Sequence, residues 1–330
     1  MTSNWTRREI LSAIASPMVL GALPPRAVAG KTMRGAFIIT ATPYTEAKKV
    51  DFEDLAGEVD FLDRCGVQGM VWTQFASEYP YLTKDERFEG MEVLAKAAKG
   101  KKLALVLGVQ AANTSEMLEF ARHAEKVEPD AVIAMPPKEA ASLDDFRDYY
   151  RALCKLAKRP VFIQTTGGAK GIEPTVEFIV ELAREFPNFG YIKEEYKPSL
   201  PRMLALAKHR PGPIKSVFGG AAGRAWPYEM RYGLDGTMPG AMYADVYATL
   251  WELHLKGERD QLREVFSKLM LMINLDAHIP GVRNYVFKRR GIFKTSISRK
   301  ADYTWSREAV EEIEHNLAGL APYLKIKLPS

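Results

Sequence analysis

One lysine stands where an amine could do covalent chemistry. Lys193 directly follows the apolar segment 189–192, which is typical of a buried strand. Desolvation at the end of such a strand would lower the pKa of its ammonium and supply a neutral amine near neutral pH. A neutral amine can attack a ketone and form a Schiff base, which then acts as an electron sink for breaking a C–C or C–O bond. The alternative is an ion pair between Lys193 and Glu194 or Glu195.

The elements that would position this lysine are short apolar segments that alternate with amphipathic helices. Most of the segments are β-branched or otherwise apolar throughout, as strands buried on both faces should be. The first helix is expected at 51–65, and Thr83 with Glu86 predicts a capping box at the start of the second. The expected strands are 35–41, 67–73, 103–108, 131–135, 161–165, 189–193, 214–219 and 236–238.

Eight strand–helix pairs predict an α/β protein with a single (β/α)8 barrel. A doubly wound open sheet would carry a glycine fingerprint after its first strand, whereas the turn here reads Thr40-Ala41-Thr42-Pro43-Tyr44. Beyond residue 256 the sequence predicts only helices, at 259–277, 280–290 and 306–320. We therefore expect a barrel at 30–256 and, at 257–330, an appended helical layer packed on it.

The N-terminal 29 residues are typical of an export signal. Thr6-Arg7-Arg8-Glu9-Ile10-Leu11 resembles a twin-arginine motif, and the apolar run that follows at 13–23 is too short for a permanent membrane anchor. Ala27-Val28-Ala29 places small residues before a cleavage site at Gly30. We expect a protein that folds in the cytoplasm, works in the periplasm and has no membrane contact after cleavage.

Charge, cysteines and histidines exclude several other classes of function. The net charge is +5, but Lys and Arg are scattered among Asp and Glu, so nucleic-acid binding has little support. Cys65 and Cys154 fall on the first and fourth helices, too far apart around a barrel for a disulfide. No cluster of His, Cys and carboxylates has the spacing of a metal site, so we expect neither a metal nor another cofactor.

Five motifs in order resemble the dihydrodipicolinate synthase and N-acetylneuraminate lyase family. Ile192-Lys193-Glu194 after a sixth strand resembles the Schiff-base lysine motif of the family. The others are the Thr-Pro-aromatic turn at 41–44, the segment 78–87, the strand-three turn at 108–114 and the C-terminal signature at 279–299. The resemblance implies class I aldolase chemistry on a 2-oxo acid, usually pyruvate, without a metal and often in a homotetramer.

The chain departs from the family pattern at the residues that bind the substrate carboxylate and transfer protons. The family's Gly-Thr-Thr-Gly-Glu after strand two reads Gln74-Phe75-Ala76-Ser77-Glu78, so Phe75 and Ala76 replace the threonines that hold the carboxylate of the 2-oxo acid. Gln164 replaces the proton-shuttling tyrosine, and an amide can orient a group but cannot act as an acid or a base. The expected arginine is Ala169, with Lys170 beside it as a substitute cation.

Three hypotheses remain open. The first is a Schiff-base lyase acting on a 2-oxo acid, whose proton shuttle is Glu194, Glu195, Tyr44, Thr165 or the substrate itself. The second is a dehydratase or hydratase that uses the same lysine, and the third is a catalytically degenerate barrel that binds a small oxo acid or sugar acid. The residues that we assign to catalysis are Lys193, Gln164 and Thr165. Those assigned to substrate binding are Thr42, Phe75, Ala76, Ser77, Glu78, Lys170, Gly219 and Gly220.

Overall fold

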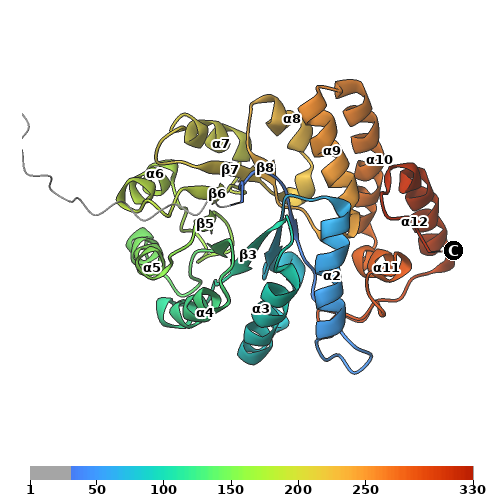
Figure 1. Cartoon of the computed structure of the whole chain (residues 1–330), viewed down its shortest axis with the longest axis horizontal. Coiled ribbons are helices and arrows are strands. Elements are labelled where there is room, and N and C mark those ends of the chain that lie inside the picture. The colour runs from blue at the N-terminus through green and yellow to red at the C-terminus, as the bar shows by residue number, and fades with distance from the viewer. Residues whose placement is uncertain (1–30, 330) are drawn as a thin grey trace, which may run out of the picture. The chain divides into compact units, whose positions relative to one another are not determined.

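Eight parallel strands form a closed barrel in chain order (Figure 1). The structure is a computed structural model that describes residues 31–329, so the expected signal peptide lies outside the described residues. The barrel closes where Gly35 and Ala36 of the first strand pair with Gly236 and Thr237 of the last. The strands are β1 (Gly35–Ile39), β2 (Gly69–Trp72), β3 (Ala104–Gly108), β4 (Ala131–Ala134), β5 (Val161–Gln164), β6 (Tyr191–Lys193), β7 (Ser216–Gly219) and β8 (Gly236–Thr237). The predicted (β/α)8 barrel is confirmed.

Helices follow the strands and surround the barrel (Figure 1). Asp51 caps the first of them by accepting hydrogen bonds from the N–H groups of Glu53 and Asp54. Thr83 and Glu86 form the expected capping box. The helices are α2 (Phe52–Cys65), α3 (Lys84–Ala98), α4 (Thr114–Val127), α5 (Leu143–Leu156), α6 (Val176–Glu185), α7 (Ser199–Ala207), α8 (Trp226–Arg231), α9 (Ala244–Lys256), α10 (Arg259–His278), α11 (Val282–Arg289) and α12 (Arg307–Leu320).

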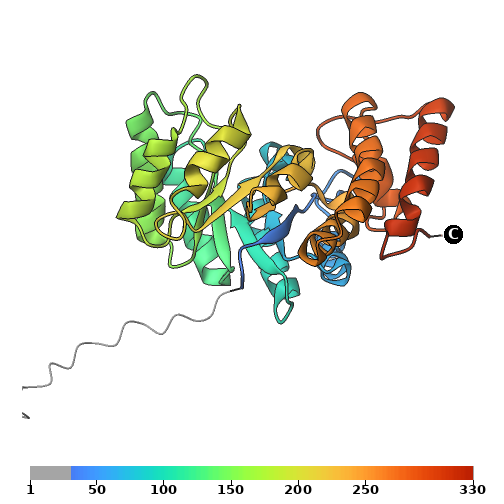
Figure 2. The same ribbon diagram turned by 90° about the horizontal axis from the view of Figure 1, so that it is seen from above.

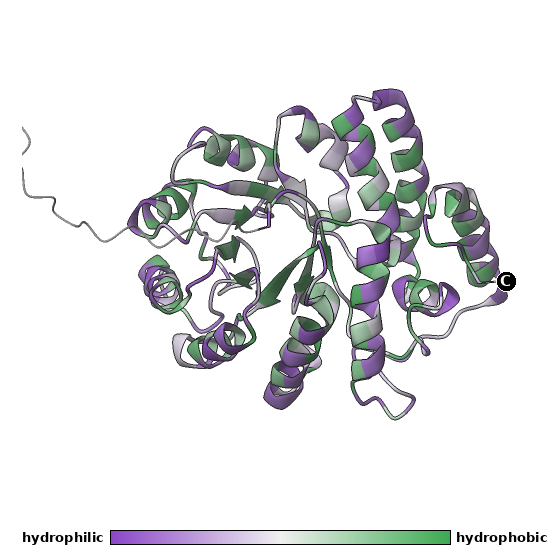
Figure 3. Ribbon diagram, in the orientation of Figure 1, coloured by the Kyte–Doolittle hydropathy of each residue, from purple (hydrophilic) through white to green (hydrophobic). Residues whose placement is uncertain are grey.

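Successive side chains along a strand point to opposite faces of the barrel wall, which divides the apolar residues into two layers. One set packs between the strands and the helices, which carry polar residues on their outer side (Figure 3). The other set fills the barrel, where the rings of Phe37, Phe162 and Phe218 contact one another at centroid distances of 4.9–6.4 Å. Because side chains two residues apart point the same way, Gln164 and Lys193 also point into the barrel, above Phe162 and Tyr191.

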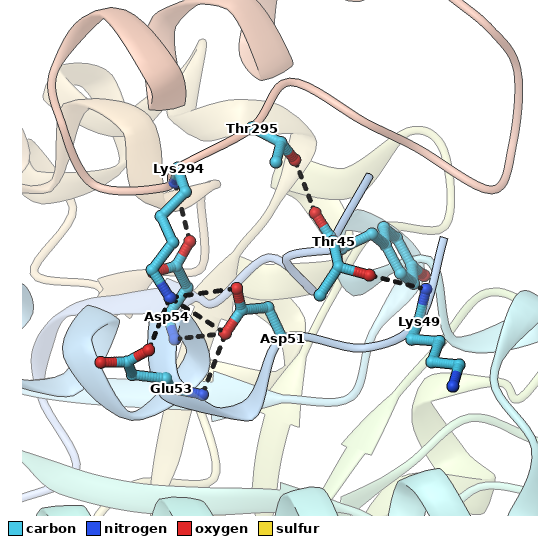
Figure 4. A network of polar contacts seen from close by, with 8 residues as sticks. Thr45, Lys49, Asp51, Glu53, Asp54, Lys294 and Thr295 are labelled. Atoms are coloured by element: carbon cyan, nitrogen blue, oxygen red, sulfur yellow. Dashed lines mark hydrogen bonds and ion pairs between the residues drawn. The ribbon is translucent and has the colours of Figure 1, made fainter. Parts of the chain in front are cut away.

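The last three helices lie beside the barrel (Figure 2). Between α11 and α12 the chain returns to the loop that follows β1. There the Lys294 ammonium lies 3.2 Å from both Asp51 and Asp54 and 2.7 Å from Glu53, all at the start of α2 (Figure 4). This connection holds the C-terminal segment against the loop that follows β1.

Several strands are shorter than expected at one end or both. The first was expected at 35–41 but ends at Ile39, and the sixth was expected at 189–193 but begins at Tyr191. Thr40 and Phe189, which flank these strands, are buried but lie outside the assigned strands, so the sequence pattern overextends both strands. Cys65 and Cys154 are buried and unpaired, as expected. In residues 31–329 no helix is long and apolar enough to cross a membrane, and no group of three metal-ligating side chains occurs.

Candidate active site

Lys193 is the last residue of β6 and is buried inside the top of the barrel, with a side chain that is 4% exposed. Its Nζ donates a hydrogen bond of 2.9 Å to Oε1 of Gln164, the residue paired with it on β5. The same Nζ lies 3.2 Å from Oε2 of Glu195. The ion pair considered as an alternative is therefore present with Glu195. Lys193 combines burial with two polar contacts that hold its amine in one place.

Glu195 links the lysine to the loop that follows β7. Its Oε1 accepts the backbone N–H of Ala221 at 2.9 Å. Burial on its own would raise the pKa of Glu195, but the Lys193 ammonium and the Ala221 N–H outweigh it and hold that pKa below the ordinary value. A Cβ on Gly220 would lie 2.0 Å from Oε1, so only glycine leaves room for this carboxylate. Gly220 was assigned to substrate binding, and the structure places it against Glu195, for which it makes space.

Glu194 faces away from Lys193. Its side chain is fully buried, its Oε1 accepts hydrogen bonds from Thr165 Oγ1 at 2.7 Å and from the Tyr196 N–H at 2.8 Å, and its Oε2 lies 3.1 Å from Arg202 Nε. Burial raises the pKa of Glu194. Thr165 Oγ1 also accepts the Glu195 N–H at 3.0 Å. The structure therefore places Thr165 as a positioning residue for the segment 194–196, and its hydroxyl makes no contact with Lys193 in the described part of the chain.

The two residues that replace the family's threonines give the site an apolar side. Phe75 is half exposed, and a Cβ on Gly167 would lie 3.1 Å from its ring and 2.7 Å from Met135 Sδ. Ala76 packs against the apolar cluster inside the barrel. Neither side chain can donate a hydrogen bond to a carboxylate. Met135 was not among the residues selected from the sequence, because a methionine at a strand end reads as ordinary core.

Thr42 and Ser77 support the loops beside the site. Thr42 Oγ1 donates to the carbonyl of Ser77 at 2.6 Å and accepts the indole N–H of Trp72 at 3.1 Å. Ser77 Oγ donates to the carbonyl of Thr40 at 2.6 Å. Both hydroxyls are buried and have backbone partners. They hold the turns after β1 and β2 together, and their hydroxyls are not free to bind a substrate.

Three other selected residues make no hydrogen bond or ion pair with Lys193 in the described part of the chain. The Glu78 carboxylate accepts the hydroxyl of Ser298 at 2.7 Å and the N–H of Arg299 at 3.3 Å, so it faces the C-terminal segment. Lys170 is exposed on the loop after β5. A Cβ on Gly219 would lie 2.3 Å from Oε2 of Glu229 on α8, so this glycine faces the helix layer and not the barrel interior.

A closed (β/α)8 barrel with a buried lysine at the end of β6 defines the class I aldolase type of barrel. Residues 32–318 match the Dihydrodipicolinate synthetase family. The 4-hydroxy-tetrahydrodipicolinate synthase of Parabacteroides distasonis is 24% identical over 258 residues, which cover 76% of this chain and 86% of that protein. The chain belongs to the Dihydrodipicolinate synthetase family and is an enzyme of its class I aldolase-type lyases.

Solved structures show the same fold. Dihydrodipicolinate synthase from Rhodopseudomonas palustris superposes with a TM-score of 0.77 at 24% identity, covering 86% of this chain and 97% of that one. The 4-hydroxy-tetrahydrodipicolinate synthase from Methylacidiphilum fumariolicum SolV has a TM-score of 0.78 at 18% identity, covering 89% and 97%. At these identities the likeness concerns the fold, and the substrate has to be inferred from the site itself.

Proposed function

We propose that Lys193 forms a Schiff base with the ketone of a 2-oxo acid, such as pyruvate or a keto sugar acid, and that the chain is a lyase that forms or breaks a C–C or C–O bond through this imine, cleavage requiring a substrate longer than pyruvate. The observation that carries this proposal is the position of the Lys193 amine. It stands inside the barrel at the carboxyl end of β6, where the active sites of such barrels lie, between a carboxylate and an amide oxygen.

The contacts of Lys193 suggest how the imine forms. Glu195 takes a proton from the ammonium, and the freed amine attacks the ketone carbon to give a carbinolamine. Return of that proton to the carbinolamine hydroxyl releases water and leaves the iminium ion. Gln164 Oε1, which holds Nζ at 2.9 Å, orients the amine throughout but does not exchange protons with it.

Bond cleavage follows from the iminium ion. In an aldol cleavage, loss of the proton from the C4 hydroxyl of the substrate drives the C3–C4 electron pair into the iminium and releases an aldehyde. The enamine left on Lys193 is protonated at C3 and then hydrolysed to the shorter 2-oxo acid. In a dehydration, the C3 proton and a hydroxyl leave instead as water. Glu195 is the ionisable side chain nearest to Nζ and is our candidate for these transfers.

A second candidate function is binding without turnover. It is favoured by Gln164, which cannot shuttle protons, and by Phe75 and Ala76, which cannot hold a carboxylate through hydroxyl groups. In that case the barrel would hold a small oxo acid or sugar acid by its polar loops. The presence of the buried amine argues for the lyase.

Trapping with borohydride separates the two functions. The protein is incubated with pyruvate and with longer 2-oxo acids, reduced, digested and analysed by mass spectrometry. We expect Lys193 to gain the mass of the oxo acid less one oxygen atom, and we expect Lys193→Arg, which cannot form the imine at neutral pH, to gain nothing. Tight binding of an oxo acid by calorimetry without any adduct would establish the binding function instead.

Location and assembly are further parts of the proposal. The motif at 6–11 supports export to the periplasm by the twin-arginine route. Lysine biosynthesis takes place in the cytoplasm, so we propose that the exported protein is a catabolic lyase for sugar acids or aromatic side chains. Family membership supports a homo-oligomer, a tetramer or a dimer. Neither nucleic acid nor membrane is among the partners that we propose for the mature chain.

A further inference from the structure

A cavity of about 330 Å³ lies between the loop after β2 and the C-terminal layer. Its lining comes from the segment after β2, from the junction of α10 and α11, and from the chain that leads to α12. The residues used below are Phe75, Glu78, Asp276, Arg283, Asn284 and Lys300. A volume of this size accommodates a chain of several carbon atoms.

Phe75 places this cavity next to the lysine site. The ring lines the cavity and also approaches Gly167, three residues after Gln164, the hydrogen-bond partner of Lys193. Because Phe75 is half exposed, its ring offers an apolar wall to the cavity. An extended substrate whose ketone is held at Lys193 would pass this wall before its far end reaches the cavity.

Among residues 31–329, the cavity offers hydrogen-bond donors that have no protein acceptor. Arg283 uses Nε and one terminal nitrogen to bind Asp276, at 3.3 and 2.7 Å, which leaves its other terminal nitrogen unengaged. Within residues 31–329, neither the Asn284 amide nor the Lys300 ammonium makes a hydrogen bond or an ion pair. Three donors, two of them on cationic side chains, therefore line one space.

The acidic residues of the cavity do not cancel these donors. Asp276 is occupied by Arg283, and both oxygens of Glu78 accept hydrogen bonds from the segment 298–299. Arg283 and Lys300 balance the charges of Asp276 and Glu78, and the donors that Arg283, Asn284 and Lys300 keep free suit an anionic group. The planar edge of a guanidinium beside an amide and an ammonium suits a carboxylate in particular.

We propose that this cavity is the outer half of the substrate site and binds a carboxylate at the far end of the 2-oxo acid, through Arg283, Asn284 and Lys300. The inference rests on the Schiff-base function proposed above. It makes the substrate a 2-oxo dicarboxylate whose middle section lies against Phe75. The replacement of a polar side chain by a phenyl ring at position 75 fits such an apolar middle section.

The test compares 2-oxo acids of equal length that differ only at the far end. The half-saturating concentration for borohydride trapping is measured for 2-oxoglutarate, 2-oxoadipate, 2-oxopimelate and 2-oxosuberate, each against the monocarboxylate with a methyl group in place of the second carboxylate. For at least one length we expect the diacid to be trapped at a concentration about tenfold lower, since a charge-assisted hydrogen bond replaces an apolar contact.

Variants of the cavity test which residues cause the preference for the diacid. Lys300→Gln removes one cation, and the double variant Asp276→Asn with Arg283→Gln removes the second without leaving an unpaired carboxylate. Both should lose most of the preference for the diacid and trap pyruvate as the wild type does. Lys288→Gln is the matched control. Lys288 is an exposed cation on α11, the helix that also carries Arg283, but its side chain does not line the cavity. It should keep the full preference.

The outcomes separate this inference from the function on which it rests. Equal trapping of diacids and monoacids at all four lengths, with pyruvate still trapped at Lys193, would overturn the carboxylate site and leave the Schiff base intact. If no oxo acid is trapped, the Schiff base fails. Calorimetry with pimelate and heptanoate, which have no ketone, then tests the cavity alone. Binding of pimelate that Lys300→Gln weakens would support it, and indifference to the second carboxylate would overturn it.

Discussion

The carboxylate of Glu195 connects Lys193 to the backbone of Ala221, with Oε2 3.2 Å from Nζ and Oε1 2.9 Å from the amide nitrogen. Lys193 ends β6 and Ala221 lies in the loop after β7, so the amine is fixed with respect to both strands. The same carboxylate is also the nearest base to the amine. Oε1 therefore positions the carboxylate through the Ala221 N–H, and Oε2 is placed to exchange a proton with Lys193.

Replacing Glu195 by glutamine tests the chemical contact. Glu195→Gln keeps an oxygen for the Ala221 N–H but leaves the buried ammonium without its counter-ion. We expect imine trapping to slow by about 10²-fold, as for loss of a general base, and the free energy of unfolding to fall by about 1–3 kcal/mol. Trapping kinetics and urea denaturation measure these effects. The exposed Glu89→Gln should change neither, and a Glu195→Gln protein that traps pyruvate at the wild-type rate would remove Glu195 from the mechanism.

Gly220 tests the positioning contact. In Gly220→Ala the new Cβ would meet Oε1 of Glu195 at 2.0 Å, so the carboxylate must move away from Ala221 and Lys193. We expect trapping to slow and stability to fall by about 1–3 kcal/mol. Gly57→Ala on α2 is the opposite control, because a Cβ there meets nothing within 4 Å. It should stabilise the protein by about 0.5–1 kcal/mol. Unchanged trapping in Gly220→Ala would contradict the packing described.

Protonation of Glu229 should make the free energy of unfolding depend on pH. This carboxyl group is buried against Gly219, and burial raises its pKa from 4.5 to about 7. Between these values the folded state holds a proton that the unfolded chain has released, so the free energy of unfolding falls as pH rises and levels off above about 7. The loss amounts to at most about 3 kcal/mol.

Glu229→Gln should remove this part of the pH dependence, because an amide does not ionise. Urea denaturation of both proteins between pH 5 and pH 8 isolates the effect of Glu229 from that of other buried acids. We expect the variant to gain stability over the wild type as pH rises through this range. The exposed Glu311→Gln should run parallel to the wild type, and parallel curves for Glu229→Gln as well would show that Glu229 is charged in the fold.

We expect Arg299 to contribute most to holding the C-terminal segment against the barrel. Its guanidinium binds both oxygens of Glu86 at 2.6 and 2.7 Å and the carbonyls of Lys48 and Tyr81, and it lies over the ring of Tyr44. We expect Arg299→Gln to lower the free energy of unfolding by about 2 kcal/mol. Limited proteolysis should cut near residue 299 sooner than in the wild type. Arg307→Gln, an exposed cation on α12, should leave the cleavage pattern unchanged.

Export is tested by the arginine pair. Arg7→Lys with Arg8→Lys keeps the charge but removes the twin-arginine motif, so we expect the protein to stay in the cytoplasm at its full length. The wild type should appear in the periplasm with Gly30 as its first residue. Cell fractionation followed by N-terminal sequencing measures both. Periplasmic delivery of the lysine variant would point to a different route.

The residues of the chain by themselves determined the barrel and its lysine. Apolar segments with helical stretches between them give eight strands, and side-chain alternation then sends Gln164 and Lys193 into the barrel. The capping box of Thr83 and Glu86 follows from local sequence, and the unpaired cysteines follow from the distance between their helices. These features depend on periodicity and order along the chain, which a sequence displays.

Only the tertiary structure decided which groups meet. Glu194 and Glu195 are neighbours in sequence, yet only Glu195 contacts Lys193, because the chain leaving β6 turns the two carboxylates to opposite sides. Thr165 and Glu78 bind backbone and C-terminal groups. The cavity beside Phe75 draws on segments more than 200 residues apart. Contacts between distant segments depend on how helices and loops pack in three dimensions, and no spacing along the chain encodes them.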